Sequence, residues 1–184
     1  MIATVILAAG SGRRMGGPKA LLMVDGETLL QRAVRMALST GCKPVIAVVG
    51  DWDIGPLDAR VTVLNNSDAA EGMASSIRMG IAAQPPESEA VLILTVDQLT
   101  VDAALLRKLL ALAASDPARP AACAYGGTLG VPAVLPRRLF HDLLALRGDH
   151  GAKPILLREK AAALPFPEGK TDLDTPEELE RFRR

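Results

Sequence analysis

Apolar runs typical of buried strands alternate with helix-like patterns along almost the whole chain. A short continuous apolar run predicts a strand buried on both faces, whereas apolar positions three or four residues apart predict a helix with one buried face. Strands are predicted at residues 3–8, 44–49, 61–64, 90–96, 121–124, 131–135 and 161–166. Helices are predicted at residues 29–39, 73–83, 103–114, 137–146, 155–159 and, after a capping box, from Thr175 onward.

This order of elements predicts a three-layer, Rossmann-like α/β fold. Strand–helix alternation implies right-handed crossovers and a mostly parallel sheet of about seven strands flanked by helices. Neither a repeat nor a linker interrupts the pattern, so we expect residues 1–184 to form a single domain. Ligands of such sheets bind beyond the carboxyl ends of the strands. The loop after Ala8, and Asp97 after the strand at 90–96, are therefore the segments in which to look for a site.

Composition and charge favour a small-molecule ligand. Hydrophobic residues make up 49% of the chain but aromatic residues only 3%, too few for a base-stacking platform. Twenty-one basic residues balance twenty-one acidic ones, so no net field attracts nucleic acid or an anionic membrane. No apolar run approaches the length of a membrane helix, and Cys42 and Cys123 form no disulfide or zinc pattern. We expect a cytoplasmic protein without nucleic-acid or membrane partners.

The loop after the first predicted strand has the composition of a phosphate-binding site. Residues 7–22 read LAAGSGRRMGGPKALL and contain four glycines and three cations. Glycines let the backbone turn so that several N–H groups point inward, and arginine presents a planar fork that matches phosphate oxygens. The spacing fits neither the GxxxxGK[ST] loop nor the dinucleotide fingerprint. The alternative is a plain surface turn with solvated cations.

Two acidic segments carry candidate metal ligands. Parallel strands would place Asp97 on the same edge of the sheet as the glycine-rich loop, where a carboxylate suits Mg²⁺ bound to a triphosphate. The alternative for Asp97 is to cap a turn. In the second segment, TDLDTP at residues 171–176, Asp172 and Asp174 point to one side if the chain is extended. The alternative there is a helix entry whose acids complement the helix dipole.

Together these segments resemble a family of nucleotidyltransferases. LAAG, an arginine, Met-Gly and a lysine three residues later resemble the signature of the MobA-like NTP transferases, which include the molybdenum-cofactor guanylyl- and cytidylyltransferases. Further elements of that family follow in the same order, namely EGM at 71–73, DQ at 97–98, GVP at 130–132, GDHGA at 148–152 and DLDTP at 172–176. The Ala-Ala-Gly form of the first motif, together with EGM, resembles the cytidylyltransferase (MocA-like) branch.

The resemblance implies a role for each matching residue. The implied catalytic residues are Arg14, Lys19 and Asp97, with Lys19 near the α-phosphate. Mg²⁺ would be held by Asp97 and Asp174, with Asp172 the weaker candidate. The implied nucleotide contacts are Leu7, Ala8, Ala9, Gly10, Ser11, Gly12, Arg14, Lys19, Gly72 and Ser75. The implied acceptor contacts are Gly130, Pro132 and Asp149.

Three positions depart from the pattern of the family. Gly12 stands where serine is frequent, which removes one hydroxyl contact but leaves the backbone cradle. Leu99 replaces the proline that usually follows Asp-Gln, next to the acceptor side. Val131 replaces a frequent histidine between glycine and proline, which removes the polar side chain that the family pattern places on the acceptor side.

The activity implied by the resemblance is transfer of CMP from CTP to the terminal phosphate of molybdopterin, with release of pyrophosphate. That phosphate is an anion at neutral pH, so positioning and charge neutralisation would carry most of the catalysis. We expect CTP to be preferred because the methyl group of Ala9 narrows the base pocket against a purine. A molybdoenzyme or its chaperone is an expected further partner. The alternatives are GTP or another small phosphorylated acceptor, and a non-catalytic molybdopterin carrier.

Overall fold

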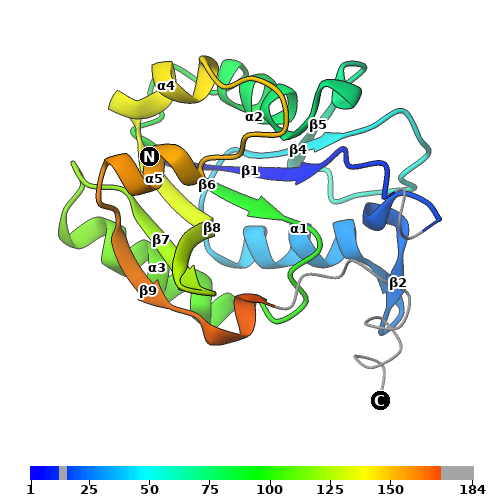
Figure 1. The fold of residues 1–184 in the computed structure, drawn as a ribbon. Helices are drawn as coiled ribbons and strands as arrows, with labels where there is room; N and C mark the ends of the chain where they lie inside the picture. The colour runs from blue at the N-terminus through cyan, green and yellow to red at the C-terminus, as the bar shows by residue number, and fades with distance from the viewer. Residues whose placement is uncertain (13–15, 171–184) are drawn as a thin grey trace.

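A seven-stranded sheet forms the centre of the computed structural model, which describes residues 1–12 and 16–170 (Figure 1). The strand order is β5–β4–β1–β6–β8–β7–β9, and β8 alone runs antiparallel to its neighbours. The strands are β1 (Ile2–Ala8), β4 (Val45–Val49), β5 (Val61–Asn65), β6 (Ala90–Thr95), β7 (Ala121–Tyr125), β8 (Thr128–Pro136) and β9 (Ala162–Pro165). The prediction of a mostly parallel sheet of about seven strands is confirmed.

Helices cover both faces of this sheet. The α-helices are α1 (Leu29–Ser39), α2 (Met73–Ala82), α3 (Ala103–Ser115), α4 (Phe140–Leu144) and α5 (Lys153–Arg158). Short 3₁₀ helices are η2 (Lys19–Leu21), η3 (Ala69–Glu71), η4 (Arg137–Leu139) and η5 (Pro167–Lys170). Helices α1 and α3 lie on one face, and α2, α4 and α5 lie on the other (Figure 1). The three-layer Rossmann-like architecture is therefore confirmed.

The two halves of the core follow from the alternation of side chains along each strand. In β4, Val45 and Ala47 pack toward α1, whereas Ile46 and Val48 pack toward α2. Successive residues of a strand point to opposite faces, so a strand covered on both sides must be apolar at every position. All five residues of β4 are buried. The apolar runs in the sequence thus reflect burial from both sides.

Local signals set where the helices begin. Thr28 and Gln31 form a reciprocal capping box at the start of α1, and the carboxylate of Asp102 accepts a hydrogen bond from the Leu105 amide of α3. The helix predicted at residues 137–146 is not continuous in the structure, where the segment forms η4 followed by the shorter α4. A small hairpin of β2 (Met23–Val24) and β3 (Glu27–Thr28) was not predicted, because its strands are too short to form a pattern.

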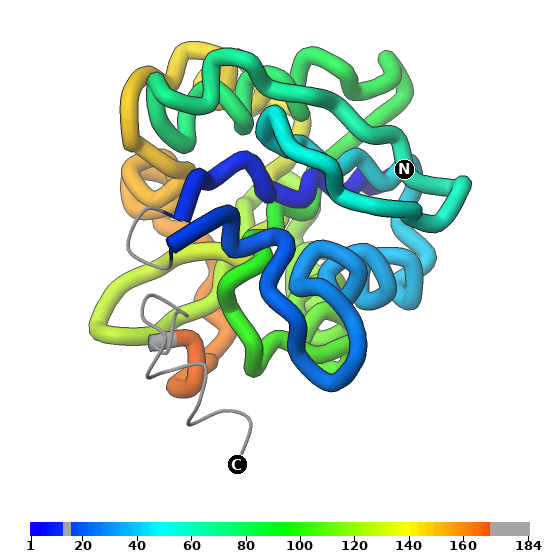
Figure 2. The backbone as a smooth tube through the Cα atoms, turned by 90° about the vertical axis from the view of Figure 1, so that its right-hand side faces the viewer, coloured from blue at the N-terminus to red at the C-terminus, as the bar shows by residue number. Residues whose placement is uncertain are grey.

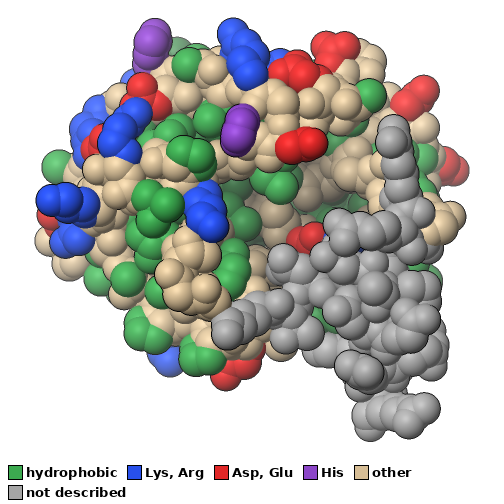
Figure 3. All heavy atoms as spheres, in the orientation of Figure 1, with side chains coloured by type: hydrophobic (Ala, Val, Ile, Leu, Met, Phe, Trp, Pro, Cys, Tyr) green, Lys and Arg blue, Asp and Glu red, His purple; other side chains and the backbone are tan. Residues whose placement is uncertain are grey.

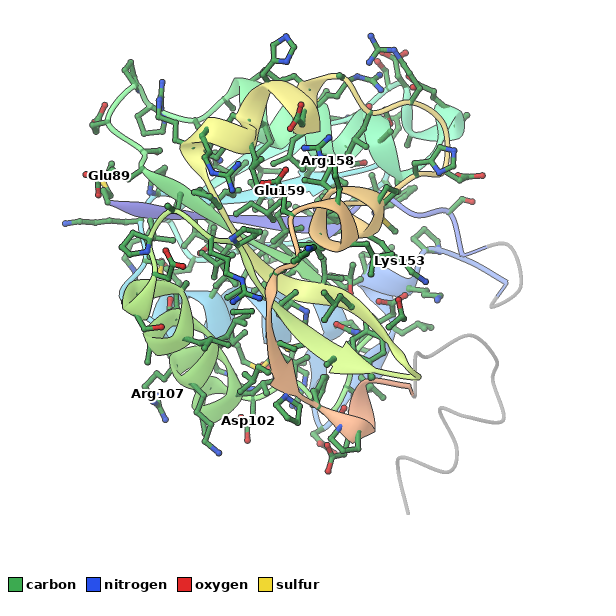
Figure 4. All side chains as sticks on the ribbon, turned by 60° about the vertical axis from the view of Figure 1, so that its left-hand side comes forward. Glu89, Asp102, Arg107, Lys153, Arg158 and Glu159 are labelled. Atoms are coloured by element: carbon green, nitrogen blue, oxygen red, sulfur yellow. The ribbon has the colours of Figure 1, made fainter. Side chains whose placement is uncertain are left out.

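Ion pairs link α4 and η4 to the C-terminal end of α5. Arg158 donates to Asp142 of α4 at 2.5 Å and to Glu159 at 3.1 Å, and Arg138 contacts Glu159 at 2.6 Å. Figure 4 shows Arg158 and Glu159 at one end of α5 and Lys153 at the other. These contacts hold α4 against the end of α5, and residues 145–152 join the two helices.

The carboxyl ends of β1, β4, β5 and β6 meet at one edge of the sheet. Both β4 and β6 pair in parallel with β1, so Ala8 lies opposite Val49 and Leu7 lies opposite Thr95. Figure 2 looks onto this edge, and the dark blue segment after β1 lies on its left-hand side. Among the described residues, no helix has the length and apolar character needed to cross a bilayer.

Candidate active site

The loop after β1 depends on one glycine. Gly12 has a φ of +58°, and a Cβ there would lie only 1.9 Å from the carbonyl oxygen of Gly17. The Gly17 amide donates to the Gly12 carbonyl at 3.4 Å, which brings the two ends of the turn together. A serine, frequent at this position in the family, does not fit this backbone. Glycine at position 12 is therefore required by both the backbone conformation and the space around it.

A cavity of about 400 Å³ opens at the carboxyl edge beside this loop. The surface is hollowed near the middle of the face shown in Figure 3. The cavity is lined by residues of the loop, of η3 and α2, of the end of β6 and of the loop before α5. They are Leu7, Ala8, Ala9, Gly10, Ser11, Gly12, Lys19, Ala69, Ala70, Gly72, Met73, Ser76, Thr95, Val96, Asp97 and Asp149.

Most of the residues singled out in the sequence therefore lie together. Leu7 through Gly12, Lys19, Gly72, Asp97 and Asp149 share one cavity. Ser75, Gly130 and Pro132 are not among its lining residues. Arg14, Asp172 and Asp174 lie outside the described residues, and the roles implied for them stay predictions.

Lys19 and Asp97 form an ion pair across the cavity floor. The Lys19 Nζ lies 3.1 Å from the Asp97 Oδ2, and the side chains are 18% and 25% exposed. Lys19 begins η2, while Asp97 comes two residues after the end of β6. Both groups keep access to solvent, so an anion can approach the ammonium and a cation can approach the carboxylate. The pair has the charges that a nucleotide and its metal require.

Asp149 enters the cavity because the loop that carries it packs closely on Gly72. Gly72 has a φ of +120°, and a Cβ there would lie 2.4 Å from the Asp149 Oδ1 and 2.5 Å from the Gly148 carbonyl oxygen. The Ala74 amide, at the start of α2, donates to that carbonyl at 3.0 Å. Glycine is therefore required at position 72 both by conformation and by space.

Ser76, rather than Ser75, faces the cavity. The Ser75 hydroxyl donates to the Gly72 carbonyl at 2.8 Å and accepts from the Asn66 Nδ2 at 2.9 Å. The same Asn66 amide donates to the Ser76 hydroxyl at 2.9 Å, and Asn66 is 2% exposed. Adjacent helix residues point about 100° apart, and the rotation of α2 places Ser76 in the cavity lining and Ser75 outside it. The sequence pattern does not state which of the two serines lines the cavity.

Gly130 and Pro132 lie in an irregular part of β8. Pairing with β7 passes from Ala122–Ala133 to Cys123–Gly130, so Val131 and Pro132 form a bulge. Proline has no N–H to donate to a ladder, and bulges accommodate it.

A polar connection joins this bulge to the end of β6. The Tyr125 hydroxyl donates to the Val131 carbonyl at 2.9 Å and accepts from the Gln98 Nε2 at 3.2 Å. Gln98 is 5% exposed, and its Oε1 has no hydrogen-bond partner among the described residues. The sequence indicates only the place of Gln98 in the Asp-Gln pair and does not predict this contact.

Leu99 anchors the segment that follows Asp97. It is 5% exposed and packs with Val24 and Leu29, which belong to the β2–β3 hairpin and the start of α1. Its carbonyl accepts from the Arg32 Nη2 at 2.9 Å. The leucine that replaces the usual proline is thus a packing residue. It holds the segment after Asp97 against the β2–β3 hairpin and the start of α1.

The donors in the cavity suit a hard divalent cation. Asp97 and Asp149 offer two carboxylates on one cavity, and no group of three potential ligands occurs in residues 1–12 and 16–170. Mg²⁺ is commonly bound by one or two carboxylates together with phosphates of a substrate. The two carboxylates therefore fit a divalent metal that also binds the phosphates of a substrate.

A mostly parallel α/β sheet with a glycine-rich loop, a lysine and an aspartate at its carboxyl edge is typical of nucleotide-binding proteins. The chain belongs to the family of the MobA-like NTP transferase domain, whose model matches residues 4–163. It is therefore a nucleotidyltransferase, as the sequence motifs predicted.

Three curated relatives extend the comparison. The chain is 30% identical to the purine catabolism protein PucB of Bacillus subtilis over 198 residues, covering 98% of this chain and 95% of the relative. It is 34% identical over 173 residues to the nicotine blue oxidoreductase of Paenarthrobacter nicotinovorans, covering 85% and 81%. It is 29% identical over 186 residues to the molybdenum cofactor guanylyltransferase of Rhodobacter capsulatus, covering 98% and 94%.

Solved structures show the same fold. The crystal structure of Rv0371c from Mycobacterium tuberculosis H37Rv has a TM-score of 0.84 and 26% identity, and the match covers 99% of this chain and 97% of that one. A complex of Rv0371c with manganese has a TM-score of 0.74 and 25% identity, covering 98% and 96%.

Proposed function

We propose that this protein transfers CMP from CTP to the terminal phosphate of molybdopterin and releases pyrophosphate. The observation that carries the proposal is the Lys19–Asp97 pair at 3.1 Å beside the glycine-rich loop, in one cavity of about 400 Å³. The name of the Rhodobacter capsulatus relative, which is a molybdenum cofactor guanylyltransferase, supports a molybdopterin-type acceptor. A molybdoenzyme or its chaperone is the proposed recipient of the product.

The reaction is an in-line displacement at the α-phosphate. An oxygen of the acceptor phosphate forms a bond to the α-phosphorus while the bond from that phosphorus to the bridging oxygen of the β-phosphate breaks. The leaving pyrophosphate keeps the bonding electron pair. The attacking phosphate is already anionic, so no side chain has to remove a proton. The work of the protein is positioning and neutralisation of charge.

Each group in the cavity has a proposed task. The amides near Gly10 and Gly12 bind phosphate oxygens, and Lys19 meets the negative charge that grows at the α-phosphate. Asp97 holds the divalent metal, with Asp174 as the proposed second ligand. Bound there, the metal would neutralise phosphate charge and orient the triphosphate. Asp149 faces the same cavity from the opposite loop and binds the acceptor.

The nucleotide specificity is proposed from the size of Ala9 and of its surroundings. Ala9 is 5% exposed, and Ala69 and Ala70 line the same cavity. A methyl group at position 9, where the guanine-specific pattern has glycine, leaves less room for a purine. The nearest alternative is the same reaction with GTP in place of CTP, or with another small phosphorylated acceptor in place of molybdopterin.

A nucleotide panel tests the proposal. CTP, GTP, ATP and UTP are each incubated with molybdopterin, with and without inserted molybdenum, in Mg²⁺ or Mn²⁺, and pyrophosphate is measured. We expect release with CTP that requires both acceptor and metal. Binding of nucleotide and acceptor without pyrophosphate release would support a carrier instead. Release of pyrophosphate from CTP in the absence of molybdopterin would contradict the proposal that molybdopterin is the acceptor.

A further inference from the structure

Glu71 and Arg78 form a two-pronged ion pair beside the cavity. The Arg78 Nη1 donates to the Glu71 Oε1 at 2.7 Å, and the Nη2 donates to the Oε2 at 2.5 Å. Glu71 ends η3 and Arg78 lies in α2, so the pair spans Gly72 and the start of the helix. The Arg78 guanidinium lowers the pKa of Glu71 to about 2, so this carboxylate stays charged at any pH suitable for an assay.

Both members of the pair also bind the backbone of the loop that carries Asp149. The Arg78 Nη1 donates to the Leu146 carbonyl at 2.9 Å, and the Gly148 amide donates to the Glu71 Oε1 at 3.3 Å. The Ala74 amide donates to the Gly148 carbonyl at 3.0 Å. Three hydrogen bonds therefore tie residues 146 and 148 to η3 and α2.

This attachment sets the position of the next residue. Gly148 has a φ of +63°. Its carbonyl group packs so closely on Gly72 that a Cβ added to Gly72 would lie only 2.5 Å from the carbonyl oxygen. Asp149 follows directly and lines the cavity, close to Gly72. A loop released from Glu71 and Arg78 would leave the Asp149 carboxylate without a fixed place relative to Lys19 and Asp97. A displacement of about 1 Å in a reacting group can cost roughly 10²-fold in rate.

We propose that Glu71 and Arg78 are positioning residues that hold Asp149 in place for the phosphorylated acceptor. The inference rests on the proposed function, in which Asp149 binds that acceptor. It gives Glu71 a different task from its neighbours in the EGM motif. Gly72 and Met73 line the cavity, whereas Glu71 does not and acts on the loop opposite.

Kinetics of Arg78→Met test the inference, because methionine keeps most of the side-chain stem and removes the guanidinium. With CTP and Mg²⁺ saturating and molybdopterin varied, we expect the acceptor KM to rise about tenfold or more, while the directly measured Kd of CTP stays within about twofold. Arg78→Lys should recover part of the loss, since it restores the charge but not the fork. A raised CTP Kd with an unchanged acceptor KM would overturn the inference.

Arg60→Met is the matched control. Arg60 forms a similar two-pronged pair with Asp58, at 2.9 and 2.7 Å, but both residues lie outside the cavity. We expect no change in either constant. The double variant Arg78→Met with Asp149→Asn should be less than about twofold worse than Asp149→Asn alone, because both changes remove one function. Effects that multiply would show that Arg78 does not act through Asp149.

Amide hydrogen exchange separates this inference from the proposed function. Without any substrate, peptides that contain residues 146–151 should exchange at least about fivefold faster in Arg78→Met than in the wild type, and at the wild-type rate in Arg60→Met. A wild-type enzyme that releases no pyrophosphate would overturn the proposed function, yet exchange would still decide whether the pair holds the loop. Unchanged exchange in Arg78→Met would overturn the inference itself.

Discussion

The Lys19 Nζ and the Asp97 Oδ2 lie 3.1 Å apart, although 78 residues separate them in the sequence. Lys19 follows the glycine-rich loop after β1, and Asp97 follows β6. The two strands are parallel neighbours, with Leu7 opposite Thr95, so their carboxyl ends bring the two charges together. Their joint position brings the glycine-rich loop and the proposed metal ligand Asp97 into one cavity.

Asp97→Asn should leave the fold intact and remove most of the turnover. The amide cannot neutralise a divalent metal, and loss of one such electrostatic contact costs about 10²-fold or more. The side chain is partly exposed and paired with Lys19, so we expect unfolding to become easier by no more than about 1 kcal/mol. Pyrophosphate release and thermal melting measure the two effects. Near wild-type activity at saturating Mg²⁺ would remove Asp97 from the site, and Asp116→Asn serves as an exposed control outside the cavity.

Lys19→Ala and Arg14→Ala should affect different constants. Lys19 is proposed to meet charge that develops in the transition state, so its loss should mainly lower kcat. Arg14 is proposed to hold the outer phosphates before and during reaction, so its loss should mainly raise the KM of the nucleotide. Initial rates over a range of CTP concentrations separate the two. Equal KM increases with unchanged kcat in both variants would contradict the proposed roles.

CTP should outcompete GTP when the two are equimolar. Steric exclusion of a purine by Ala9 corresponds to roughly 1–3 kcal/mol, or about 10- to 200-fold. Ala9→Gly should then raise the share of guanylated product. Chromatography of the products measures the ratio. An excess of guanylated product in the wild type would reverse the specificity while leaving the nucleotidyltransferase family unaffected.

The two cysteines should react very differently with a thiol reagent. Cys123 is fully buried in β7, and burial raises the pKa of its thiol to about 12. Only about one molecule in ten thousand would carry its thiolate at pH 8. Cys42 is partly exposed at the turn after α1. We therefore expect one fast-reacting thiol per chain in the native wild-type protein and none in native Cys42→Ser. The wild-type protein in denaturant should show two. A second fast thiol in the native protein would contradict the burial of Cys123.

Periodicity and local signals alone determined the layered α/β fold and most of its elements. Apolar runs such as 44–49 predicted doubly covered strands, and the α1 pattern at 29–39 gave the observed helix, because burial on a regular element leaves a regular trace in the sequence. Motif order placed Lys19, Asp97 and Asp149 in one site. The ends of parallel strands share an edge, which made Lys19 and Asp97 predictable neighbours.

Tertiary structure decided what depends on close contacts between distant segments. Only the rotation of α2 relative to the cavity shows that Ser76, and not Ser75, lines it. Glu71 reads as part of a nucleotide motif, yet its carboxylate binds Arg78 and the Gly148 amide. Such side-chain-to-backbone contacts have no period and no fixed spacing, because they depend on how two loops pack at an angstrom scale. A sequence pattern records burial and turns, whereas these contacts come from the packing of the whole chain.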